Sequence, residues 1–163
     1  MVALTMKELC EWVERTASGW RNLIALHRDV LSLPCDIRET SSVAELLQHI
    51  MAVQLRYAER LNGLTETPYE DIPHNSGEEI FAVHDRSMAL LLQLPEWSEK
   101  DWEVVLEFST RSSGILRASR RTVFAHLLLH SIRHYAQLAT IVRQHGVKPD
   151  WGMDYLFMCL SSQ

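Results

Sequence analysis

The residues of this sequence whose type and spacing suggest chemistry are histidines. His126, His130 and His134 stand four residues apart in the segment VFAHLLLHSIRHYAQL. Because each four-residue step turns an α-helix by about 40° net, the three imidazoles share one side of a helix. His130 and His134 also share its apolar stripe, which contains Leu127, Leu138 and Ile141. The pattern therefore predicts two imidazoles that point into the protein interior.

Two buried imidazoles need partners for their ring nitrogens, because an unpaired buried polar group costs on the order of 2 kcal/mol. A divalent metal ion can satisfy them, since neutral imidazole binds first-row metals and an i,i+4 pair on one helix can hold one ion. A third ligand would come from a facing helix, where His49, in LLQHIMAVQ, is the natural candidate. The alternative is a chance His-x-x-x-His pair that hydrogen-bonds to side chains or surface water. Spacing alone leaves both interpretations open.

Helices must position these histidines, and the sequence indicates where the helices begin. Thr5, Ser42 and Ser76 are each followed three residues later by Glu, a pattern that caps helix N-termini. Apolar residues recur at helical spacing after each of these positions, and again after residue 119. We therefore expect an all-α bundle of four helices, at about 5–30, 43–61, 78–94 and from 119–122 to 145.

Two shorter segments flank the last expected helix. Before it, apolar residues alternate over 104–108, and Ser113-Gly114 is suited to turn a short hairpin. After it, residues 151–160 have the pattern of a short amphipathic helix that folds back on the bundle.

The composition is that of one ordinary globular domain spanning residues 1–163, with 47% apolar and 23% charged residues. A net charge of −5 without a basic face argues against nucleic-acid binding. No segment approaches the roughly 18 consecutive apolar residues of a membrane span, so we expect a cytoplasmic protein. Cys10, Cys35 and Cys159 share no close spacing, which favours reduced thiols over disulfides or cysteine metal ligation.

Two segments give the chain a family resemblance. LLQHIMAVQLRYAERL and HSIRHYAQLATIVRQHGVKP, the latter a His-x-x-x-His followed by x-x-Gln and Arg-Gln-x-Gly-x-x-Pro, resemble motifs of the DinB/YfiT family, and the resemblance covers nearly the whole chain. It implies a four-helix bundle with long crossover connections and a central histidine triad that binds a divalent metal ion, commonly nickel or zinc, with iron a further candidate. Carried over by position, the metal ligands are His49, His130 and His134, while His126 falls outside the triad. Ala136 stands where many relatives have Gly.

The resemblance narrows the function without selecting one. Relatives include transferases that use low-molecular-weight thiols such as mycothiol, bacillithiol or glutathione, and metal-dependent hydrolases, and they often form homodimers. The residues between His130 and His134 include no glutamate of the HExxH type to act as a base. We expect either a metal-dependent enzyme acting on a small molecule or a non-catalytic metal-binding or stress-associated bundle, and the sequence does not decide whether the chain is catalytic.

Several residues near the expected site keep two interpretations. Gln137 either orients a ligand or caps an interhelical contact, and Gln54 and Tyr57 either reach the pocket or belong to the core. Arg111 or Arg117 either binds a carboxylate of a thiol cofactor or lies on the surface. The sequence thus identifies no catalytic or cofactor-binding residue beyond the three metal-ligand candidates.

Overall fold

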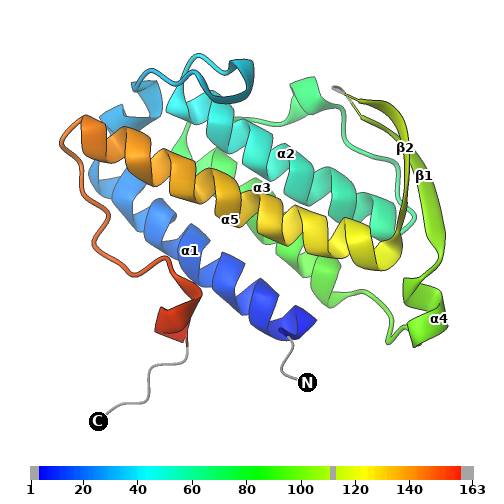
Figure 1. The fold of residues 1–163 in the computed structure, drawn as a ribbon. Helices are drawn as coiled ribbons and strands as arrows, with labels where there is room; N and C mark the ends of the chain where they lie inside the picture. The colour runs from blue at the N-terminus through cyan, green and yellow to red at the C-terminus, as the bar shows by residue number, and fades with distance from the viewer. Residues whose placement is uncertain (1–3, 111–112, 159–163) are drawn as a thin grey trace, which may run out of the picture.

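The fold is the predicted all-α bundle, and the computed structural model describes residues 4–110 and 113–158. The four long helices are α1 (Met6–Leu26), α2 (Val43–Leu61), α3 (Gly77–Leu92) and α5 (Arg120–Gln144) (Figure 1). Between α3 and α5 lie the short helix α4 (Glu99–Trp102) and a hairpin of β1 (Val105–Thr110) and β2 (Gly114–Ser119). The 3-10 helices are η1 (Arg28–Ser32), η2 (Ile37–Glu39), η3 (Tyr69–Asp71) and η4 (Tyr155–Met158).

The helix starts follow the capping signals of the sequence. The side chains of Thr5, Ser42 and Ser76 each accept a hydrogen bond from the backbone N–H three residues later, at the first turns of α1, α2 and α3. Ser119 caps α5 in the same way. The expected helix starts are therefore confirmed to within a residue or two.

The first helix is shorter than predicted. It ends at Leu26 instead of near Val30, and the chain continues as the 3-10 turn η1. That turn carries Val30 into the core, where its side chain is fully buried. The break lies at His27, whose φ of −130° and ψ of 72° are outside the helical region.

The core shows how the four helices run. At one end of the bundle, the C-terminal halves of α1 and α5 pack with the N-terminal halves of α2 and α3. At the other end, Val13 of α1 and Val123 of α5 pack with Leu61 of α2 and Leu91 of α3. Helices α2 and α3 therefore run parallel to each other and antiparallel to α1 and α5. Residues 62–76 must then return along the length of the bundle, which is the long crossover connection expected.

The hairpin before α5 is confirmed. Strand β1 pairs antiparallel with β2, with Leu106 opposite Ala118 and Phe108 opposite Leu116. Gly114 begins the return strand with φ of 67°, a left-handed conformation that glycine adopts without strain. Leu106 and Phe108 point to the same face of the strand and pack against the helical core, while alternate residues face outward.

The tail is less helical than predicted. Only Tyr155–Met158 form a 3-10 turn, and residues 159 and 160 of the expected helix lie outside the described residues, as does Cys159. The Trp151 ring packs edge-on against Trp20 and lies so close to Gly19 that an added methyl group would overlap it. This close contact fixes the chain in a non-helical path at the start of the tail.

Two further expectations concern the described residues. Cys10 and Cys35 both carry free thiols, as predicted. None of the helices in the described part of the chain is long and apolar enough to cross a membrane.

The returning connection between α2 and α3 is held by a buried carboxylate. Glu59 of α2 is 1% exposed, and its oxygens accept hydrogen bonds from the backbone N–H and the hydroxyl of Thr67, both at 2.7 Å. The guanidinium of Arg86, from α3, donates a third at 2.6 Å. Glu59 therefore ties α2, the crossover and α3 together.

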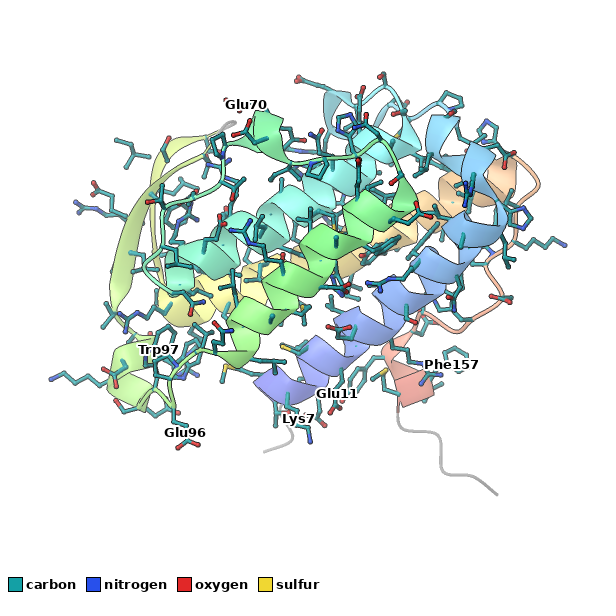
Figure 2. All side chains as sticks on the ribbon, turned by 180° about the vertical axis from the view of Figure 1, so that it is seen from behind. Lys7, Glu11, Glu70, Glu96, Trp97 and Phe157 are labelled. Carbon is teal, nitrogen blue, oxygen red and sulfur yellow. The ribbon has the colours of Figure 1, made fainter. Side chains whose placement is uncertain are left out.

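This geometry predicts that Glu59→Ala lowers the free energy of unfolding by about 2–3 kcal/mol, because it leaves the Thr67 N–H without its charged acceptor. Urea unfolding of the wild type and the variant measures the change. Glu11→Ala is the control, since Glu11 forms an exposed i,i+4 pair with Lys7 at the start of α1 (Figure 2) and should change stability by only about 0.5 kcal/mol. Equal losses in the two variants would contradict the structural importance of Glu59.

Candidate metal centre

Three histidines meet where α2 packs against α5. His49 comes from α2, and His130 and His134 come from successive turns of α5. The Nε2 atom of His130 lies 3.1 Å from Nε2 of His49 and 3.1 Å from Nε2 of His134. One ring nitrogen of each residue lies within 4.8 Å of the other two. The structure thus brings together the three histidines that the sequence singled out.

Gln137 fixes the tautomer of one of these imidazoles. Its side-chain oxygen lies 2.6 Å from Nδ1 of His134. An amide oxygen can only accept, so the His134 proton resides on Nδ1 and the lone pair of Nε2 faces the other two histidines. Of the two interpretations of Gln137, the contact therefore favours the one in which it orients a ligand.

Burial keeps the cluster neutral. His130 and His134 are 7% and 1% exposed. Burial, reinforced by the neighbouring imidazoles, lowers the pKa of His130 to about 2. Burial and the nearby Arg133 guanidinium lower the pKa of His134 to about 4, although the hydrogen bond to Gln137 acts in the opposite direction. Both side chains are consequently uncharged at neutral pH, which is the form that binds a metal ion.

Hydrogen bonds between the rings account for only part of these contacts. A neutral imidazole carries one N–H, so Nε2 of His130 cannot donate to His134 and also accept from His49. The other nitrogen of His130, Nδ1, is buried and has no hydrogen-bond partner among the described residues. Three nitrogens bonded to one tetrahedral ion at 2.0–2.1 Å would stand roughly 3.3 Å apart; two of the three pairs here lie at 3.1 Å, and all three lie within 4.8 Å. The donor set therefore fits a divalent first-row metal.

A cavity leads from the surface to this cluster. It encloses about 730 Å³, which is room for a small organic molecule, and both His49 and His130 form part of its wall. Tyr57 and His126 line it as well. An ion at the cluster would therefore be reachable from solution.

The remaining histidines and polar residues fall into distinct places. His126 is exposed and lies outside the triad, with its ring centroid 5.3 Å from that of His130. Tyr57 lines the cavity, so it reaches the pocket as one of its two interpretations predicted. Gln54 is fully buried and joins two other core side chains, donating to Ser131 at 2.9 Å and accepting from His84 at 2.8 Å. Gln54 therefore belongs to the core.

Sequence reasoning missed the charged part of the cavity wall. Four arginines line it, Arg38, Arg56, Arg60 and Arg133. Arg117 instead forms an exposed ion pair with Glu107 on the hairpin, which favours the surface alternative, and Arg111 lies outside the described residues. The only sequence signal for these arginines was that Arg133 stands between His130 and His134, two of the predicted ligands.

Comparison with known proteins agrees with the resemblance drawn from the motifs. The model of the DinB family matches residues 1–161. No curated protein matches the chain.

The depressed pKa values of His130 and His134 predict that metal-free protein loses stability in mild acid. The unfolded chain takes up protons at these imidazoles near pH 6.5, whereas the folded chain does so only near pH 4 or below. Between those limits the unfolded state holds more protons. The free energy of unfolding should therefore fall, as the pH falls, by up to about 1.4 kcal/mol per pH unit for each histidine. Urea unfolding of chelator-treated protein between about pH 7 and pH 5 measures this change in the free energy of unfolding.

His130→Gln removes one of the two groups and should flatten this pH dependence by up to about 1.4 kcal/mol per pH unit. His27→Gln, at the exposed end of α1, is the matched control and should leave it unchanged. If wild type and His130→Gln lose stability in parallel, the neutral buried cluster is not the origin of the acid sensitivity.

Proposed function

The chain belongs to the DinB family, and on that premise we propose that it is a metal-dependent enzyme that holds one divalent ion through His49, His130 and His134. The observation that carries the proposal is the convergence of three Nε2 atoms at the wall of a solvent-accessible cavity. Three protein ligands leave at least one coordination position for a water or a substrate atom, which distinguishes catalytic from purely structural sites. Nickel and zinc are the first candidates, and iron the next, because all bind imidazole well.

The cluster favours a thiol over water as the nucleophile. A bound divalent ion lowers the pKa of a water or thiol in its open position. The ion has to lower the pKa of water from about 15.7 to about 7 before the water ionises at neutral pH, whereas a thiol starts near 8.5 and needs a much smaller shift. No carboxylate of the described residues joins the three imidazoles. We therefore propose transfer of a small-molecule thiol to an electrophile, with hydrolysis as the alternative.

The surrounding residues would position the reactants. Gln137 holds the His134 ring so that the lone pair on Nε2 faces the other two histidines. Tyr57 and His126 supply polar groups on the cavity wall beside His130. Glu45 also lines the cavity, but its carboxylate accepts from the N–H and hydroxyl of Ser41 and is thereby held away from the ligands.

The cavity is also the observation that argues against the non-catalytic alternative, which predicts a closed cluster. A metal-binding scaffold has no need for a passage of this size to its ion. The homodimer implied by the family resemblance stays a prediction, which the mass of the protein in solution would test.

We expect the purified protein, exposed to zinc or nickel and then gel-filtered, to retain close to one ion per chain. His49→Ala and His130→Ala should each weaken retention by at least about tenfold, because two imidazoles hold a divalent ion poorly. His126→Ala is the control: it removes an imidazole from the same side of α5 without touching the triad. Elemental analysis of the four proteins measures the outcome.

Loss of metal in His126→Ala equal to that in His130→Ala would contradict the assignment of the triad. So would a wild type that retains no ion after each metal has been supplied separately.

The thiol proposal predicts that zinc- or nickel-loaded protein accelerates the reaction of bacillithiol, mycothiol or glutathione with a small alkylating electrophile. The His130→Ala variant should lose this acceleration together with its ion, and His126→Ala should keep a large part of it. A spectrophotometric assay of thioether formation follows the reaction. Metal-loaded protein that accelerates ester or amide hydrolysis but none of the thiol reactions would support the hydrolase alternative instead.

A further inference from the structure

The four arginines of the cavity wall divide into two pairs. Arg56 and Arg60 share one carboxylate, with Arg56 Nη2 3.0 Å and Arg60 Nε 2.8 Å from the oxygens of Glu66. The Arg60 guanidinium also lies over the rings of Tyr57 and Phe108, at 4.5 Å and 4.0 Å from their centroids. These two arginines are therefore committed to holding the hairpin and the crossover against α2.

Arg38 and Arg133 form the second pair, and they differ in having no such partner. Both are exposed and line the cavity, and within residues 4–110 and 113–158 neither forms an ion pair with a carboxylate. Both guanidinium groups lower the pKa of His134 through their charge, so both lie near the triad. Two permanent positive charges thus face the space next to the candidate ligands.

The backbone at Arg38 is strained. Arg38 and Glu39 adopt φ of 58° and 62°, two successive left-handed residues without a glycine. Such residues are energetically costly and persist only where neighbouring contacts enforce them. Thr40 provides these contacts, since its backbone N–H and its hydroxyl both donate to the carbonyl oxygen of Ile37, at 3.1 Å and 2.6 Å. The turn held in this way places Arg38 at the cavity wall.

Arg133 contacts the triad directly. Its Nη2 lies 3.1 Å from Nε2 of His134, so the guanidinium donates to the lone pair that a metal ion would use. A divalent ion and Arg133 therefore compete for the same atom and repel each other. An anion placed between the ion and the guanidinium groups would relieve that repulsion and accept hydrogen bonds from both arginines.

We propose that Arg38 and Arg133 bind a carboxylate of the small molecule on which the protein acts, next to the metal ion. The proposal rests on the function proposed above and names the class of its substrate. The planar fork of a guanidinium matches a carboxylate in two parallel hydrogen bonds. Glu39 and Glu45 also line the cavity, and their negative charges disfavour a dianion such as phosphate relative to a monoanion.

The test is titration of zinc-loaded protein with propionate at constant ionic strength, followed by NMR of the arginine side-chain and histidine signals. Propionamide, which has the same shape and no charge, serves as the ligand control. Arg38→Gln and Arg133→Gln should each weaken propionate binding on the order of tenfold. Arg143→Gln, an exposed arginine on the same helix and outside the cavity, should leave it unchanged.

Zinc content is measured on every variant so that the two proposals fail separately. Propionate that binds Arg38→Gln and Arg133→Gln as tightly as Arg143→Gln, with zinc retained, overturns the carboxylate site and leaves the metal site standing. The carboxylate site is also overturned if propionamide or phosphate binds as tightly as propionate. If the wild type retains no zinc, the proposed function fails. Propionate titration of the zinc-free wild type and of the Arg38→Gln, Arg133→Gln and Arg143→Gln variants then tests whether Arg38 and Arg133 bind a carboxylate.

Discussion

The structure depends on the contact between α2 and α5, because that contact brings His49 together with the buried, uncharged imidazoles of His130 and His134. Burial keeps His130 and His134 neutral, so each ring carries one N–H and one lone pair. A divalent ion can bind one lone pair of each ring at the same time, which a hydrogen bond between two of the rings does not do. Gln137 completes the arrangement by holding the His134 tautomer that leaves Nε2 available.

The long connections of the bundle then decide what can reach this cluster. The turn that contains Arg38 and the hairpin that packs beside Tyr57 both border the cavity, so the segments outside the four helices form much of its wall. The ion pair of Arg60 with Glu66 holds the crossover against α2, and the same guanidinium lies over the Phe108 ring of the hairpin. The helices therefore position the ligands, whereas the connections define the pocket and its charge.

The part of this architecture that could be predicted is the part governed by local rules. Capping by Ser42 and the helical spacing of His130 and His134 are properties of neighbouring residues. His49 was a candidate because it lies on another apolar helix, and the resemblance to a known family then assigned it as a ligand. The end of α1 could not be predicted, because the break at His27 is marked by no glycine or proline and the apolar spacing continues past it to Val30. The place of Arg38 at the cavity wall could not be predicted either, because it depends on a left-handed turn that contains no glycine to signal it.

Binding of one metal ion by three imidazoles, with one coordination position left open, is what the proposed function requires. X-ray absorption spectroscopy of the zinc-loaded protein tests this most directly. It should show three histidine nitrogens at 2.0–2.1 Å and at least one further light-atom ligand from solvent. A spectrum with fewer than three imidazoles, or with sulfur from a cysteine in the coordination shell, would contradict the account.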